Sequence, residues 1–145
     1  PANIIISETE PFDYGQRAIG STTLQTFTLT NNGGVSTAAM TGSLGTASYG
    51  FEGGGAFPGL SGSCGAILAP LASCTMVVQF TPGSAAVFPD TIQVSYNDGI
   101  AVVNSNRGVT GEGVAAAMLT ISDPGFDYDD SLENYDDLDF DENWN

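Results

Sequence analysis

The sequence predicts an all-β fold in which two sheets pack face to face. Three stretches, residues 22–30, 75–81 and 91–96, alternate side chains with a period of two, which is the pattern of a half-buried strand. Gly, Pro, Asn and Asp interrupt the chain at intervals of about ten residues, as in β-sandwiches. No helical periodicity precedes residue 122. About seven or eight short strands are therefore expected.

The first strand is expected at residues 3–7, where three consecutive Ile residues form a β-branched run. Pro11 ends this run, and Phe12 and Tyr14 then alternate with polar residues to resume extended structure. Residues 16–20 are predicted to form a loop.

The second clear strand begins at Thr22 and directs Phe27 and Leu29 toward the core, while threonines occupy the opposite face. Asn-Asn-Gly-Gly follows at residues 31–34. We expect a tight hairpin turn there, because Asn-Gly favours positive φ angles.

Two further strands are expected within residues 35–44 and 47–52, and Gly53 then opens a long loop that runs to Ser63. A glycine-rich loop can hold an anion. This one has neither the Lys nor the following helix of a phosphate-binding loop, so a flexible connection is predicted.

Both cysteines of the chain, Cys64 and Cys74, flank nine residues that include Gly65 and Pro70 and can fold back into a small ring. A disulfide there contributes on the order of 3 kcal/mol in the chain-entropy model. A reduced pair is the alternative. A metal site is disfavoured because the chain has no His and no second Cys pair.

Alternation predicts two more strands, one after Cys74 and one at residues 91–96, and Val77 falls on the outer face of the first. Asn-Asp-Gly at residues 97–99 predicts a second hairpin turn, and a return strand starts at 100–103 and is completed at 109–113. The side chains expected to face the core are Met76, Val78, Phe80, Ile92, Val94 and Tyr96.

The charge is strongly negative and unevenly placed. Residues 1–122 hold seven acidic and two basic residues, a net charge of −5, and residues 123–145 hold ten acidic residues, which together give the −15 of the chain. Binding to nucleic acid or to an anionic membrane is excluded on this ground. The longest apolar run, residues 114–119, is too short for membrane insertion.

Two closely spaced cysteines and the absence of Lys favour an oxidising, extracellular location. The first residue is Pro rather than Met, so we expect a processed mature form or an excised fragment.

Three stretches occur in a characteristic order. Residues 64–82 have the pattern Cys-Gly-x-x-Leu-x-Pro-x-x-Ser-Cys-Thr-x-x-Val-x-Phe-Thr-Pro; Phe-Asp-Tyr-Gly at 12–15 precedes Phe-Thr-Leu-Thr-Asn at 27–31; and Val-Thr-Gly-Glu-Gly closes at 109–113. Together they resemble the bacterial "choice-of-anchor D" repeat, a relative of the Hydin-type (ASH) and major-sperm-protein-like immunoglobulin folds. The resemblance implies an immunoglobulin-like β-sandwich with a structural or binding role and no family active site.

Residues 119–128 repeat the pattern of residues 4–14: an apolar triplet, Ser and an acid, then Pro and Phe-Asp-Tyr. This segment therefore resembles the first strand of a next repeat. Either the chain was cut within an array, or the extra strand is itself functional. Such a strand can add to the sheet edge of another subunit, and head-to-tail use gives an open filament. The residues predicted for this assembly strand are Leu119, Ile121, Phe126 and Tyr128.

Residues 127–145 interleave acids with aromatic residues. They are expected either to dock on a protein partner or to form a solvated terminus that keeps the protein soluble. Asp137, Asp139 and Asp141 alternate like the start of a calcium loop, but an EF-hand is excluded because the glycine and the later ligands are missing. A looser calcium site is the remaining metal hypothesis.

Enzymatic chemistry is not expected, and neither catalytic residues nor a cofactor are predicted. Without His, a Ser-His-Asp set cannot be built. The cysteines lack the spacing and basic neighbours of a redox pair. The acids before the tail are interpreted as solvated turn residues: Glu8, Glu10, Asp13, Glu52, Asp90, Asp98 and Glu112.

The sequence thus predicts an immunoglobulin-like sandwich at residues 1–114, followed by a linker, an extra strand and an acidic tail at 115–145. The favoured function is an extracellular structural protein, a fibre subunit or surface module that self-assembles or contacts a neighbouring repeat. The alternative is an adhesin-type module that binds a carbohydrate, a protein or calcium through residues 53–63 and the tail. An intracellular scaffolding domain, as in the eukaryotic relatives, is disfavoured by the cysteine pair and the absence of Lys.

Overall fold

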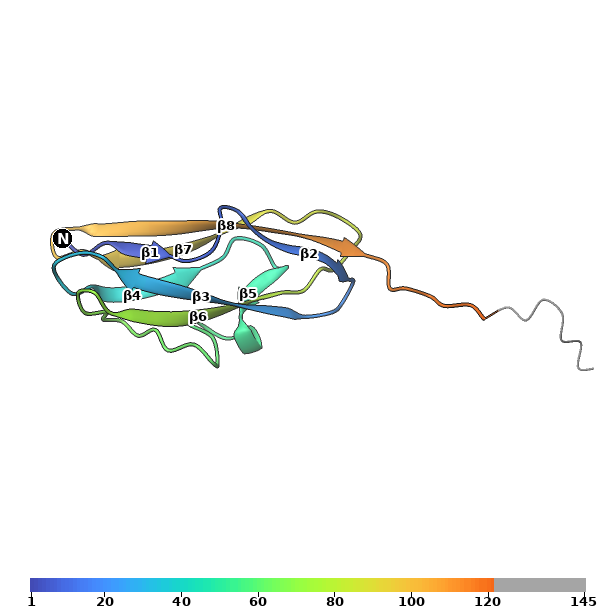
Figure 1. The fold of residues 1–145 in the computed structure, drawn as a ribbon, viewed down its shortest axis with the longest axis horizontal. Helices are drawn as coiled ribbons and strands as arrows, with labels where there is room; N and C mark the ends of the chain where they lie inside the picture. The colour runs from blue at the N-terminus through green and yellow to red at the C-terminus, as the bar shows by residue number, and fades with distance from the viewer. Residues whose placement is uncertain (122–145) are drawn as a thin grey trace, which may run out of the picture.

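The computed structural model describes residues 1–121 and arranges them in two four-stranded sheets that pack face to face (Figure 1). One sheet has the order β1-β3-β6-β5 and the other β2-β8-β7-β4. This is the strand arrangement of an immunoglobulin-like sandwich, so the predicted fold class is confirmed. The strands are β1 (Ile4–Ile6), β2 (Phe12–Ala18), β3 (Thr23–Asn31), β4 (Ala38–Ser43), β5 (Tyr49–Phe51), β6 (Ser73–Phe80), β7 (Asp90–Asn97) and β8 (Val102–Val114).

The core lies between the sheets and is built from the alternate residues of the strands, as predicted. Phe27 and Leu29 of β3 are fully buried. Tyr49 of β5 stacks on Phe80 of β6 with ring centroids 4.8 Å apart. The six inward-facing side chains predicted for β6 and β7 are all buried. Each large apolar side chain contributes about 1.5–3 kcal/mol by leaving water.

The first part of the chain changes sheets. β1 pairs with β3 in an antiparallel ladder, whereas β2 pairs in parallel with β8. The predicted loop at residues 16–20 is wrong in part, because Gln16, Arg17 and Ala18 continue β2 opposite Glu112, Gly113 and Val114. A bulge between Asp13 and Gln16 shifts the register with β8 by one residue, and the strand continues beyond it.

The Asn-Asn-Gly-Gly turn does not form the predicted hairpin. β3 and β4, which it joins, belong to different sheets, so the connection crosses from one sheet to the other. Asn31 itself is fully buried. Its Oδ1 accepts hydrogen bonds from the N–H groups of Asn3 and Gly33, and its Nδ2 donates to the carbonyls of Val35 and Leu68.

The predicted return strand is one continuous element. β8 runs for 13 residues, and its first eight pair with β7 in a single register. Residues 115–121 lie beyond it and belong to no strand. Of the predicted assembly strand, Leu119 and Ile121 are described, whereas Phe126, Tyr128 and the calcium candidates Asp137, Asp139 and Asp141 lie outside the described residues. No helix in residues 1–121 is long and apolar enough to cross a membrane.

Candidate functional site

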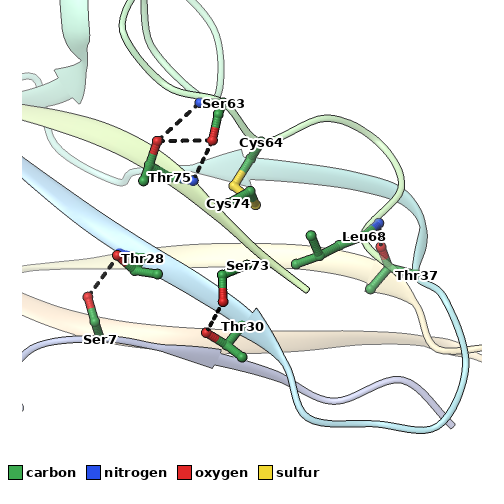
Figure 2. Close-up of a disulfide and its surroundings, with 10 residues drawn as sticks. All are labelled: Ser7, Thr28, Thr30, Thr37, Ser63, Cys64, Leu68, Ser73, Cys74 and Thr75. Carbon is green, nitrogen blue, oxygen red and sulfur yellow. Dashed lines mark hydrogen bonds between the residues drawn. A yellow bond between two sulfur atoms is a disulfide. The ribbon is translucent and has the colours of Figure 1, made fainter. Parts of the chain in front are cut away.

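The two cysteines form a disulfide that fixes the segment leading into β6 (Figure 2). Their Cα atoms lie 4.9 Å apart, and both residues are buried. The ring that they close reaches across to β4, where Met40 N–H donates to the carbonyl of Ala66 and Thr37 N–H to the carbonyl of Leu68, both at 3.0 Å. The ring therefore covers part of the outer edge of β4.

The segment at residues 53–63 is not the flexible connection that the sequence predicted. It runs along β6 beyond the end of β5, where Val77 N–H donates to the carbonyl of Pro58 at 2.8 Å and Ser63 N–H to the carbonyl of Thr75 at 2.9 Å. Glu52 also accepts hydrogen bonds from the N–H and Oγ of Ser61. These contacts fix the segment, and they explain why Val77, predicted to face outward, is buried.

Gly59 makes this close approach possible. Its φ of +90° lies in the region that favours glycine, and a Cβ there would lie 2.8 Å from the carbonyl oxygen of Val77. The neighbouring Leu60 projects into solvent. The segment thus presents an exposed apolar side chain on a fixed backbone.

Paired hydroxyl groups lie on part of the outer face of the β1-β3-β6 layer (Figure 2). Thr30 Oγ1 and Ser73 Oγ lie 2.8 Å apart across the β3–β6 pair, and Ser63 Oγ lies 3.1 Å from Thr75 Oγ1. Because these hydroxyls bond to one another, they do not form a cluster of free donors, and the exposed Ile5 and Leu24 add apolar surface to the same face.

Five of the seven acidic side chains before the tail accept hydrogen bonds from backbone N–H groups, so they have a structural role beyond that of solvated turn residues. Asp90 accepts from the N–H groups of Gly45 and Thr46. Asp98 accepts from Ile100 and Ala101 N–H in the β7–β8 turn, and these bonds lower the pKa of its carboxyl. No group of metal-ligating side chains is found within residues 1–121.

Two buried tyrosines join the sheets rather than forming an acid–base pair. Tyr14 donates to the carbonyl of Val78 at 2.9 Å, and Tyr49 donates to the carbonyl of Phe88 at 2.7 Å. Burial is the main reason that the pKa of each phenol is raised well above its ordinary value. Both hydroxyls therefore stay protonated as structural donors.

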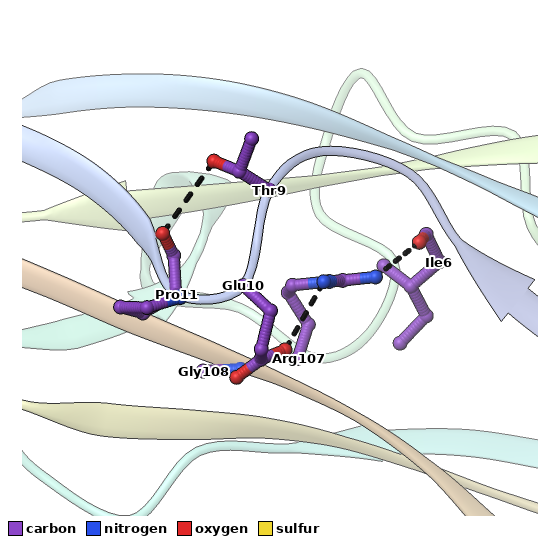
Figure 3. Close-up of polar contacts among 6 residues, drawn as sticks. All are labelled: Ile6, Thr9, Glu10, Pro11, Arg107 and Gly108. Carbon is purple, nitrogen blue, oxygen red and sulfur yellow. Dashed lines mark hydrogen bonds and ion pairs between the residues drawn. The ribbon is translucent and has the colours of Figure 1, made fainter.

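Side chains from the second sheet close the outer edge of β1. Tyr96 Oη accepts from Ile4 N–H at 3.0 Å, and Ser105 Oγ donates to the Ile4 carbonyl at 2.6 Å. Arg107 Nη2 donates to the Ile6 carbonyl at 2.6 Å, and its Nη1 pairs with Glu10 at 3.1 Å (Figure 3). Tyr96 was predicted only as a core residue and Glu10 only as a solvated acid, and no role was predicted for Ser105 or Arg107. The one available signal was that Arg107 is one of only two cations in the chain.

The two ends of the sandwich differ in what they expose. The N-terminus and the β7–β8 turn lie at one end of the long axis, where Ile100 is exposed (Figure 1). The chain leaves β8 at the opposite end, and Met118, Leu119 and Ile121 are there 90%, 86% and 85% exposed. The predicted assembly residues that the structure describes are thus solvent-accessible and remote from the N-terminus.

No family model and no curated protein matches this chain. Solved structures share its fold. The ASH/PapD-like domain of human CEP192 (PapD-like domain 7) is 13% identical with a TM-score of 0.54, over 79% of this chain and 87% of that one. The VesB protease of Vibrio cholerae is 15% identical with a TM-score of 0.55, over 77% and 31%. A protein of unknown function from Porphyromonas gingivalis W83 is 16% identical with a TM-score of 0.58, over 77% and 46%.

At these identities the likeness establishes the fold alone, an immunoglobulin-like sandwich. The chain spans less than half the length of the two bacterial proteins. The matched part of the protease is therefore no reason to assign proteolysis to this chain.

Proposed function

We propose that this protein is a non-enzymatic extracellular module that joins to neighbouring copies, or to a neighbouring repeat of the same protein, by adding its C-terminal segment to their sheets. The observation that carries the proposal is the exposure of Met118, Leu119 and Ile121 at the end of the sandwich opposite the N-terminus. Three exposed large apolar side chains within four residues are typical of an interaction site. An extended segment that adds to a sheet edge gains main-chain hydrogen bonds.

The arrangement favours head-to-tail assembly. A connector at one end and an acceptor elsewhere on the same chain make a heterologous contact, which builds an open fibre unless the rotation closes it. The Cys64–Cys74 disulfide supports an oxidising, extracellular location. The ordered motifs at residues 12–31, 64–82 and 109–113 support membership of the choice-of-anchor D type.

Three chains test the proposal: the full chain, a chain ending at Ser122 and a chain ending at Gly113. We expect the first two to form large species in sedimentation and negative-stain microscopy, and the third to stay monomeric. The chain ending at Ser122 is the control for the acidic tail. Assembly by the full chain alone would assign the connection to residues 123–145, and assembly by the shortest chain would refute the proposal.

A second candidate is an adhesin-type binding module. It is favoured by Leu60, Ile67 and Leu71, which are exposed on the two segments that flank Cys64 and that backbone hydrogen bonds fix in place. A ligand would then contact this side of the sandwich rather than the C-terminal segment. An adhesin-type module stays monomeric over the whole concentration range in which a fibre subunit assembles.

A further inference from the structure

The first half of β8 is an open sheet edge. In an antiparallel ladder, alternate residues of a strand direct N–H and C=O to the partner, and the residues between them direct theirs to the other side. Gly111 and Gly113 bond to Phe88 and Ala86, which continue β7 in the register of the β7–β8 ladder. Odd-numbered residues of β8 therefore face β7, and even-numbered residues face away.

The away-facing groups are occupied only in the second half of the strand. Val114 accepts a hydrogen bond from Ile19 N–H, next to β2, and Gly108 N–H donates to Glu10. Within residues 1–121, no hydrogen bond reaches the outward N–H and C=O groups at the even positions of 102–106. This open edge offers the N–H and C=O groups of Val102, Asn104 and Asn106.

The other edges of the described sheets are closed or irregular. The edge of β1 is bonded by side chains of β7 and β8, as described above. On β5, Tyr49 N–H donates to the carbonyl of Thr46, and Phe51 bridges to Gly55. The ring at residues 64–74 covers part of β4, and a bulge next to Asp13 distorts β2. Such devices are how sheet edges avoid unwanted pairing. Ser105 and Arg107 bond to β1 with their side chains, but no bulge and no side-chain bond blocks the outward backbone groups of Val102, Asn104 and Asn106.

We propose that the open edge at residues 102–106 receives residues 115–121 of a second copy as a parallel strand. The inference rests on the proposed function and names the acceptor for its connector. β8 runs along the long axis from the end with the N-terminus to the end where the chain leaves (Figure 1). A segment that leaves one copy in this direction meets the next copy at Val102 and runs the same way as its β8.

The lengths and the chemistry of the two partners match. Five residues of strand extend about 17 Å, and the seven residues of the segment reach about 23 Å, which leaves two residues to cross between copies. Residues 115–121 carry no charge, and neither do Val102, Asn104 and Asn106. β2 already pairs in parallel with the second half of this edge, so the added strand would continue its line.

Addition is favoured over replacement of β1, although the segment resembles β1 in sequence. Ile4 and Ile6 are buried, and three side chains from β7 and β8 bond to the outer edge of β1. A replacing strand would first have to break these bonds. In the proposed arrangement, Leu119 and Ile121 of the added strand face the other sheet. Thr120 then lies on the outer face, on the same side as Asn104 of the acceptor copy.

The test is an Asn104→Pro variant of the full chain, with Asn104→Ala as its control. Asn104 N–H points away from β7, so proline removes a donor of the open edge without breaking the β7–β8 ladder. We expect Asn104→Pro to raise the concentration for half-assembly by about tenfold or more, and Asn104→Ala to leave it unchanged. Circular dichroism checks that both variants keep the fold.

A cross-link provides a second measurement that does not depend on proline. Asn104→Cys chains mixed with Thr120→Cys chains should form an intermolecular disulfide, whereas Thr26→Cys on the opposite face, paired with Thr120→Cys, should not. If Asn104→Pro assembles like the control and no selective cross-link forms, while the chain ending at Gly113 stays monomeric, the acceptor assignment is wrong and the proposed function stands. If the full chain never assembles, both are wrong.

Discussion

At the scale of single residues, several polar side chains act as substitutes for backbone partners. Tyr96, Ser105 and Arg107 bond to the outer edge of β1, where another strand would otherwise bond. Asn31 bonds four backbone groups, two in the β3–β4 connection and one each at Asn3 and Leu68. A buried amide with several backbone partners contributes more to stability than a single hydrogen bond, because its removal leaves several buried groups without partners.

We therefore expect Asn31→Ala to lower the free energy of unfolding by roughly 2–4 kcal/mol. The variant leaves the N–H groups of Asn3 and Gly33 and the carbonyl of Val35 unpaired, whereas the carbonyl of Leu68 keeps its bond from Thr37 N–H. Urea denaturation measures the loss. The matched control is Asn32→Ala, whose side chain is exposed and forms no hydrogen bond, and which should change the free energy by about 0.5 kcal/mol or less. Equal losses in the two variants would show that the amide of Asn31 has no special role.

At the scale of elements, local sequence patterns were sufficient to predict the strands but not the connections between them. The alternation in β3, β6 and β7 predicted which side chains are buried because strand geometry requires it. Whether Asn-Asn-Gly-Gly makes a hairpin depends on where β4 pairs, which those four residues do not specify. The bond from Val77 to Pro58 and the burial of Val77 follow from the path of a distant segment, so the pattern around Cys74 could not predict them.

The candidate site was predictable to a similar degree. The repeat of residues 4–14 at 119–128 predicted Leu119 and Ile121 as assembly residues. The structure shows that both are exposed, and their role in assembly stays a prediction. The acceptor edge was not predictable, because it depends on which groups of β8 remain unpaired after β2 has crossed between sheets. The side chains that close β1 lie 92 and 101 positions away along the chain.

The ring at residues 64–74 is the element whose contribution is most directly measurable. We expect Cys64→Ala combined with Cys74→Ala to lower the free energy of unfolding by about 3 kcal/mol, because the open ring restores freedom to the unfolded chain. A reducing agent should lower the stability of the unmodified protein by a similar amount and leave the variant unchanged.

Hydrogen exchange should locate the effect of opening the ring. Relative to the unmodified protein, the variant should show a larger increase in exchange rate at the amides of Met40 and Thr37, which bond to the ring, than at the amides in the centre of the β3–β6 ladder. Uniform acceleration throughout the sandwich, or none at all, would contradict a local bracing role for the disulfide.

At the scale of the whole molecule, charge and assembly oppose each other. Each copy carries a net charge of −15, of which −10 lies in residues 123–145. Copies joined through residues 115–121 bring these acidic tails together with bodies that are also negative. The repulsion is long-ranged at low salt and is screened at physiological salt. The proposed contact itself, between uncharged residues, has no salt dependence of its own.

We therefore expect added salt to promote assembly. Raising sodium chloride from about 10 mM to about 150 mM shortens the Debye length from about 30 Å to about 8 Å and should lower the concentration for half-assembly several-fold. Light scattering across a dilution series measures this concentration. The chain ending at Ser122, which lacks ten acidic residues, should respond much less. An equal response would place the repulsion in the sandwich instead.

Calcium separates general screening from a specific site in the tail. Trp144 is the only tryptophan of the chain, so its fluorescence reports on the region of Asp137, Asp139 and Asp141. Under pure screening, calcium and magnesium at equal ionic strength should promote assembly equally and leave the Trp144 emission unchanged. A calcium-specific change in emission, together with a lower concentration for half-assembly, would instead make the tail a calcium-dependent regulator of strand addition, because neutralised carboxylates no longer repel the next copy.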